Sequence, residues 1–300
     1  MEKYMCFIQP GNKLTLSVAV PLLHLLCLFA PFCFSWDALG IAFGLYILTG
    51  LGITVSYHRN LSHKSFKVPK WLEYFLAYWG VQALQGDPIG WVSNHRYHHR
   101  FTDSKKDPHS PIQGFWFSHI GWLYDSESAK ARALQREEQT NVADLENQAF
   151  YKFIQKTYII HHIMLGAFLF SIGGFPYIVW CMGVRIVYLG HITFLVNSVC
   201  HMWGHQAWNT GDLSRNNWFV ALLAFGEGWH NNHHAFEHSA RHGLEWWQLD
   251  TSWCTIWTLQ KLGLAKNVKL PSDAQKRKMT FRNIDNSKLS SDGFPQLPLK

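Results

Sequence analysis

Charged residues are scarce in this sequence, and its cysteines are few and scattered. Asp, Glu, Lys and Arg make up 16% of the 300 residues, and the six cysteines form no C-x-x-C pair. This spacing excludes a disulfide framework and a zinc ribbon, and no G-x-G-x-x-G fingerprint of a dinucleotide-binding fold is present. The net charge of +7 is not gathered into one basic patch interleaved with aromatic residues. We therefore expect no nucleic-acid partner.

The missing charges define four long apolar stretches, which are interrupted only by Arg185. They lie in two pairs, with short breaks at Trp36-Asp37 and around Gly173 to Pro176. Each stretch has about 20 residues, enough to cross a hydrocarbon core of roughly 30 Å. We predict an all-α integral membrane protein with four transmembrane helices in two hairpins. Buried core helices of a soluble protein are the alternative. The predicted spans are 14–35, 38–57, 158–180 and 181–200.

Lys and Arg residues flank these stretches on one side, and the tips of the hairpins are nearly free of them. By the positive-inside rule, both termini and the long central loop should face the cytosol. We expect the endoplasmic reticulum as the location. Residues 266–300 are polar, basic and interrupted by prolines, so we expect them to form a flexible tail behind a single domain of residues 1–265.

Histidine is abundant, with 18 residues, and the informative ones form three clusters. The pattern H-x-x-H-H occurs twice, at 95–99 and at 230–234, and His58 and His63 precede both. On a helix, positions i, i+3 and i+4 lie on one face, so each copy aims three imidazoles at one point. His58 and His63 lie about 140° apart on an ideal helix, and we expect them to converge because the helix ends between them. Eight imidazoles are too many for one tetrahedral zinc, which indicates two metal ions.

The ligand type does not identify the metal, because imidazole suits zinc, copper, iron and nickel. Soluble di-iron proteins use Glu-x-x-His motifs, and only one such pair occurs here, at Glu227 and His230. Its carboxylate could bind a metal directly, or it could contact a histidine that binds the metal. A metal transporter would place histidines inside the spans, whereas these clusters lie beyond the span ends.

The segments around the clusters closely resemble the membrane-bound acyl desaturases, and most closely the plant-type delta-9 acyl-CoA and acyl-lipid branch. The resemblance covers about residues 15–265 and implies a di-iron enzyme with four spans and a helical cytosolic cap. The segments that carry it are His58-Arg59-Asn60-Leu61-Ser62-His63, residues 86–99, 107–111, 114–119 and 196–204, and Glu227-Gly228-Trp229-His230-Asn231-Asn232-His233-His234.

The resemblance also implies which residues hold the two irons. Asn197 would bind one of them through a water molecule. Neighbouring carboxylates should fix the tautomers of the ligand rings, and the candidates are Asp87, Asp103, Asp107 and Glu227. The implied ligands are His58, His63, His95, His98, His99, His201, His230, His233 and His234.

One position departs from the family. Gly90, directly before Trp91, occupies a position that is often acidic in related sequences. If that carboxylate orients a ligand histidine, its absence would weaken iron binding, since loss of such a partner typically costs roughly 10–100-fold.

The implied reaction is the oxygen-dependent insertion of a cis double bond, expected at delta-9, into a saturated acyl-CoA or acyl-lipid. Electrons would come from a separate carrier such as cytochrome b5 or a ferredoxin. A basic face could meet this donor or the phosphates of coenzyme A, or could simply face anionic lipid. Its residues are Arg59, Lys64, Arg96, Arg100, Lys105 and Lys106.

An apolar tunnel must carry the acyl chain past the metals, and we expect Ala42, Tyr46 and Trp91 to line it. Two other functions share these histidine clusters. A di-iron membrane hydroxylase would insert oxygen into a lipid, and a metal transporter would move metal without consuming oxygen.

Overall fold

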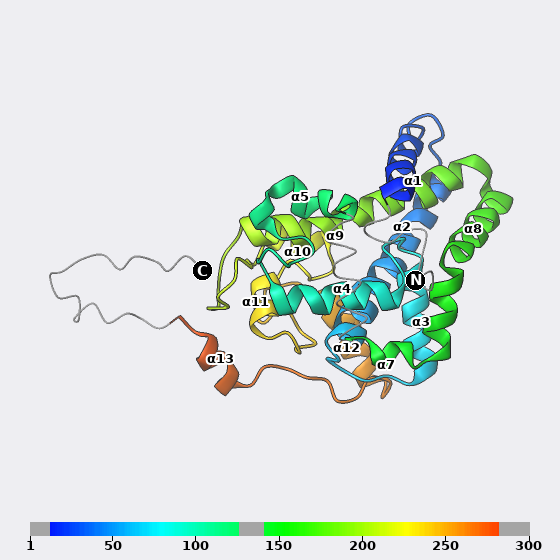
Figure 1. Ribbon diagram of the computed structural model, residues 1–300. Helices are drawn as coiled ribbons and strands as arrows, with labels where there is room; N and C mark the ends of the chain where they lie inside the picture. Colours follow the sequence, from blue (N-terminus) through cyan, green and yellow to red (C-terminus); the bar gives the residue numbers. More distant parts are fainter. Residues whose placement is uncertain (1–12, 126–140, 282–300) are drawn as a thin grey trace, which may run out of the picture.

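The computed structural model describes residues 13–125 and 141–281, and within these ranges every regular element is a helix (Figure 1). The β-type contacts there are three isolated bridges. The all-α prediction is therefore confirmed. The helices are α1 (Lys13–Cys27), α2 (Trp36–Leu51), the π-helix η1 (Gly52–Ser62), α3 (Lys70–Val81), α4 (Pro88–Phe101), η2 (Pro111–Gln113), α5 (Phe115–His119), η3 (Gly121–Tyr124), α7 (Ala143–Glu146), α8 (Ala149–Tyr177), the π-helix η4 (Ile178–Val184), α9 (Arg185–Met202), α10 (Trp218–Leu223), α11 (His230–Ala235), α12 (Thr251–Lys261) and α13 (Asp273–Met279).

Two continuous helical stretches are long and apolar enough to cross a membrane, Trp36–Ser62 and Ala149–Met202. The second has 54 residues and kinks at Gly174, where φ is 64° and ψ is −153°. Pro176, which cannot donate a helical hydrogen bond, follows the kink. The break between the third and fourth predicted spans therefore lies at the Gly-Gly-Phe-Pro sequence as expected, a few residues before the predicted boundary at residue 180.

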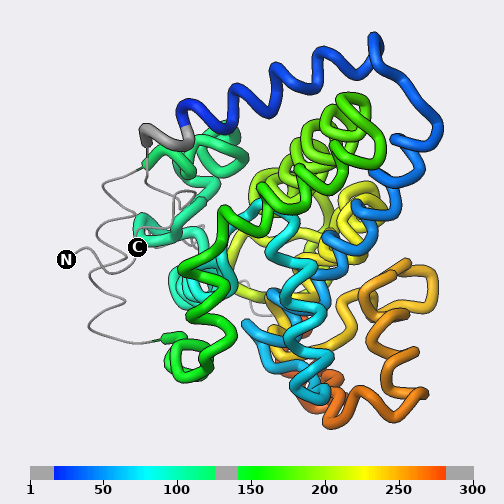
Figure 2. The backbone as a smooth tube through the Cα atoms, turned by 90° about the vertical axis from the view of Figure 1, so that its right-hand side faces the viewer, coloured from blue at the N-terminus to red at the C-terminus, as the bar shows by residue number. Residues whose placement is uncertain are grey.

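The first predicted span is also shorter than expected. Helix α1 ends at Cys27, and turns occupy the residues before α2 begins at Trp36. Ser35 caps α2, since its side chain accepts a hydrogen bond from Ala38 N. In Figure 2 the turn between α1 and α2 lies at the opposite end of the molecule from the segment that contains α12. The cap elements thus gather around the far end of α2, where the histidines begin.

The helix that starts at Trp36 ends at Ser62, between His58 and His63 as expected, but this end is not what brings the two rings together. The helix widens into a π-helix from Gly52 to Ser62, and His63 N donates to His58 O over 3.2 Å. In a π-helix the hydrogen bonds connect residues five apart. His58 and His63 are therefore one turn apart, and both imidazoles point to the same side.

Two glycines allow α3 to pack directly on this π-helix. A Cβ atom on Gly52 would overlap the backbone of Gly80, and one on Gly80 would lie 2.5 Å from the Tyr57 ring. The two backbones therefore touch, and larger residues would separate them. This contact fixes the segment that carries His58 against the rest of the fold.

The segment after residue 265 was expected to be a flexible tail; its described part is largely exposed but is hydrogen-bonded to the body. Lys266 exchanges two backbone hydrogen bonds with Lys67, both of 2.8 Å, and Asn209 N donates to Met279 O over 2.8 Å. Residues 266–281 are therefore attached to the cap by hydrogen bonds at Lys266 and Met279. Residues 282–300 lie outside the described part of the chain.

Candidate metal centre

Nine histidines come together in two groups at the cap end of the long helices. In each group the candidate ligand atoms all lie within 4.8 Å of one another. The chain thus brings together all nine histidines of the predicted set, from η1 and the residue that follows it, and from α4, α9 and α11. The first group is His58, His63, His95, His99 and His233, and the second is His98, His201, His230 and His234.

Local structure explains how α4 and α11 contribute. Asp87 caps α4 by accepting hydrogen bonds from Ile89 N and Gly90 N, and Pro88 occupies the first turn, where proline is favourable. Because α4 is regular from Pro88 to Phe101, its H-x-x-H-H histidines lie on one face. They do not aim at one point as predicted, because His95 and His99 join the first group and His98 joins the second. Helix α11 is short, but it contains the whole second copy.

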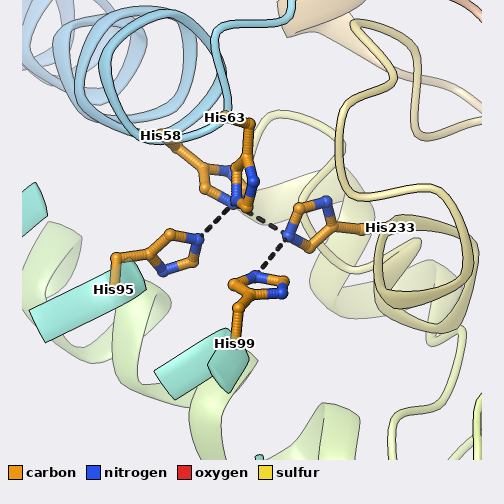
Figure 3. Close-up of side chains that lie close together, drawn as sticks. All are labelled: His58, His63, His95, His99 and His233. Atoms are coloured by element: carbon orange, nitrogen blue, oxygen red, sulfur yellow. Dashed lines mark hydrogen bonds between the residues drawn. The ribbon is translucent and has the colours of Figure 1, made fainter. Parts of the chain in front are cut away.

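In the first group the rings meet through their Nε2 atoms (Figure 3). The distance is 2.7 Å between His63 and His95, 3.1 Å between His58 and His233, and 2.9 Å between His233 and His99. These rings come from three elements far apart in the sequence and converge on one point.

The second group converges in the same way. His230 Nε2 lies 3.0 Å from His201 Nε2 and 3.0 Å from His234 Nε2. His98 Nε2 is buried and has no hydrogen-bond partner within the described residues. Asn197, one helical turn before His201, lines the adjacent cavity.

Carboxylates hold the opposite sides of four of these rings at Nδ1. Asp107 lies 2.9 Å from His98 Nδ1, Asp103 lies 3.0 Å from His201 Nδ1, and Glu227 lies 2.6 Å from His58 Nδ1. These are three of the four carboxylates named from the sequence. The fourth ring, His234, is held over 2.9 Å by Asp212, which the sequence analysis missed.

This arrangement fits metal binding. A carboxylate at Nδ1 accepts the proton of that nitrogen, so the Nε2 atom of the same ring presents a lone pair. Lone pairs that face each other across about 3 Å repel, unless a cation lies between them. Two such clusters of neutral imidazoles suit transition metals. The nine rings exceed the four ligands that a single tetrahedral zinc would need.

Burial keeps the unsupported rings in the form that binds metal. Desolvation holds the pKa values of several ligand histidines well below the ordinary value, and neighbouring histidines lower them further. Metal ions bind the neutral imidazole, so these rings need not lose a proton at neutral pH. They are His63, His95, His99, His230 and His233.

Two further groups contact Glu227, and the sequence predicted neither contact. Arg59 is fully buried and donates to Glu227 and Asp250, so it is not part of the expected basic face. His242 is 1% exposed, and its Nδ1 lies 3.2 Å from Glu227 Oε2. A single arginine or histidine in a sequence gives no signal for such a role.

Asp87 differs from its expected role beside the ligand rings. Its Oδ1 atom accepts hydrogen bonds from the first turn of α4 and from Gln155 Nε2 over 3.1 Å. This carboxylate therefore positions α4 through the helix terminus.

An apolar cavity adjoins the histidines. Its walls include Trp91 and the α9 residues Leu189, Ile192, Thr193 and Val196, together with several ligand rings. Of the three predicted tunnel residues, Trp91 lines this cavity. Ala42 instead packs with Leu45, Leu169 and Cys181, and Tyr46 stands behind Phe225, with ring centroids 5.1 Å apart.

The sequence is similar to those of known proteins. A family model described as fatty acid desaturase matches residues 17–257. The chain is 65% identical over 267 residues to the chloroplastic palmitoyl-monogalactosyldiacylglycerol delta-7 desaturase of Arabidopsis thaliana, a match that covers 88% of this chain and 71% of that protein. It is 59% identical to acyl-CoA 5-desaturase AL21 of Anemone leveillei (89% and 82% covered) and 56% identical to delta-9 acyl-lipid desaturase 1 of Arabidopsis thaliana (86% and 84% covered).

Proposed function

This chain belongs to the fatty acid desaturase family, which confirms the resemblance, and we propose that it inserts a cis double bond into a saturated acyl-CoA or acyl-lipid with two iron ions held by its nine histidines. The observation that carries this proposal is the placement of two carboxylate-supported histidine groups beside an apolar cavity. The relatives named above differ in both acyl carrier and double-bond position. Delta-9 therefore stays a prediction.

The reaction removes two hydrogens from neighbouring methylene groups, which no side-chain acid or base can do. The bound irons would supply the oxygen-derived oxidant that this step requires. The protein holds the acyl chain against Trp91 and Val196, excludes water with apolar walls, and fixes the ring of His58 through Glu227. Asn197 faces the same cavity and would hold a metal-bound water.

We propose four membrane crossings, two before the cap and two in the stretch that kinks at Gly174. The 54 residues of Ala149–Met202 extend about 80 Å at 1.5 Å per residue, which is long enough for two crossings. Helix α1 would supply the first crossing together with the turns that follow it. Both termini and the metal centre would face the cytosol at the endoplasmic reticulum. Fractionation of tagged protein tests this location against the chloroplast, because one relative is named as chloroplastic.

An external donor such as cytochrome b5 or a ferredoxin would deliver the two electrons. Four exposed cations remain from the predicted basic face once two residues are removed, the buried Arg59 and Arg96, whose side chain is 17% exposed and donates to Ser62 O and Asp144. One of the four, Lys64, also pairs with Asp144, but its side chain is 61% exposed. The four cations could bind an acidic donor or the phosphates of coenzyme A. They are Lys64, Arg100, Lys105 and Lys106.

Expression in a desaturase-deficient yeast tests the function directly. The expected result is growth without added unsaturated fatty acid, with new double bonds whose positions are determined by mass spectrometry. The His233→Ala variant should abolish both, because His233 Nε2 meets two other rings of the first group. Hydroxylated products in place of double bonds would instead identify a hydroxylase, and metal flux without any lipid product would identify a transporter.

A further inference from the structure

We define the far end of the cavity beside the metal centre as the part of its lining that lies farthest from the histidines along α2 and α9. Gly50 and Leu189 line it there, and His58 and Asn197 line it at the histidine end. Leu189 and Asn197 are eight residues apart on α9, roughly 12 Å at 1.5 Å per residue, and Gly50 and His58 are also eight residues apart in the sequence. Phe225 lies in the wall at the far end, against Gly50.

Phe225 is held there in an unusual backbone conformation. Its φ is 56°, a left-handed value that non-glycine residues rarely adopt. Its carbonyl accepts a hydrogen bond of 3.0 Å from Ser252 N, and a Cβ atom on Gly50 would overlap its ring. Such strained residues persist only where the surroundings fix them, and they gather at functional sites.

Behind the Phe225 ring lies Tyr46, which does not line the cavity. The Tyr46 hydroxyl donates to Leu223 O over 2.6 Å, and this bond ties the end of α10 to α2. The ring of Phe225 is thus the surface that separates the cavity from Tyr46 and from the rest of α2.

The same ring is tied to the metal centre by a very short connection. Only Gly226 separates Phe225 from Glu227, and Glu227 lies 2.6 Å from His58 Nδ1. Phe225 is therefore only two residues away from the carboxylate that contacts a ring of the first histidine group.

We propose that Phe225 is the residue that ends the acyl cavity, so that the methyl end of the substrate rests on its ring and the length of chain beyond the metals is set there. This inference rests on the proposed desaturase function.

The test compares Phe225→Ala, Phe225→Leu and Phe225→Trp in the yeast assay, with saturated chains of graded length supplied. Phe219→Ala is the matched control, because Phe219 is on α10 and is 52% exposed. The alanine and leucine variants should accept longer chains, or place the double bond nearer the carboxyl end. The tryptophan variant should favour shorter chains. A methylene in an apolar pocket typically changes selectivity by about 10–200-fold, so we expect at least about a tenfold change in product ratio.

A second measurement does not depend on turnover. Saturated acyl-CoA of graded length should raise the unfolding temperature of the metal-free protein, and the best length should increase in Phe225→Leu but not in Phe219→Ala. An unchanged product ratio in active variants, or an unchanged best length in inactive ones, overturns the assignment. If the wild-type chain makes no double bonds although the best length shifts as expected, the desaturase proposal fails and the role of Phe225 stands.

Discussion

Replacing Glu227 by glutamine tests the central physical claim about the metal centre, that a buried carboxylate sets the orientation of a ligand ring. Glu227 is 6% exposed, and its Oε2 atom lies 2.6 Å from His58 Nδ1. Arg59 donates to Oε1 from two nitrogens, over 2.9 and 3.1 Å. The substitution keeps the shape of the side chain and removes its charge.

The expected loss is in metal affinity more than in folding. Removing a partner that orients a metal-bound histidine typically costs roughly 10–100-fold in affinity, which is about 1.4–2.7 kcal/mol. Arg59 keeps a second carboxylate, since Asp250 lies 2.9 Å from it. The fully buried guanidinium is therefore not left without a counter-charge, and the fold should survive.

Glu237→Gln is the matched control, because Glu237 also faces a ligand ring. Its carboxylate lies 3.6 Å from His99 Nδ1, and its side chain is 47% exposed. Exposed pairs contribute about 0–1 kcal/mol, so the control should lose at most about fivefold in affinity.

The assay is iron per chain in purified protein dialysed against a graded series of chelator, with circular dichroism to confirm the fold. Glu227→Gln should release iron at roughly 10–100-fold lower chelator concentration than the wild-type protein. The reasoning is refuted if Glu227→Gln keeps its iron as the wild type does, or if both variants lose iron equally.

Three further outcomes follow from the packing and charge of the cap. Gly52→Ala should lower the free energy of unfolding by about 1–3 kcal/mol, because its Cβ would overlap Gly80, whereas Gly44→Ala, with open space around it, should not; thermal unfolding distinguishes them. Gly90→Asp should raise iron content above that of Gly90→Ala if a carboxylate there orients a ligand, and equal iron in both removes that concern. Burial, helped by nearby Arg59, lowers the pKa of His242 to about 4. The unfolded chain takes up a proton there near pH 6.5, so the metal-free protein should lose about 1.4 kcal/mol of stability per pH unit from about 6.5 down to 4 through this group. A pH series of chemical denaturation should show a flatter dependence in His242→Gln.

The parts of the site that the sequence predicted are those that depend on local periodicity. The spacing of His95, His98 and His99 puts them on one face of any α-helix, and α4 is regular. The long apolar stretches likewise predicted the long helices, because length and composition decide them. Helix ends were less predictable, and α1 stops at Cys27 although the residues up to Ser35 are uncharged.

The parts that the sequence did not predict depend on backbone geometry or on distant contacts. The His58 and His63 pair requires a π-helix, and nothing in a periodicity argument based on 3.6 residues per turn signals this geometry. Asp212 reaches His234 from a loop that lies 22 residues earlier in the sequence. From sequence alone, a lone aspartate in a polar loop is expected to be a solvated surface residue, so Asp212 gave no sign of this contact.

The carboxylates of the outer layer come from segments that also stabilise the cap. Asp250 caps α12 by accepting from Trp253 N and also holds Arg59, which in turn holds Glu227 and, through it, His58. A chain of buried contacts thus connects the start of α12 to a ring of the first group. Because metal affinity depends on how firmly each ring is oriented, iron binding and cap folding should be one coupled equilibrium. The nine histidines then form a metal site only when the segments after α9 have packed, which is why their spacing alone could not specify the centre.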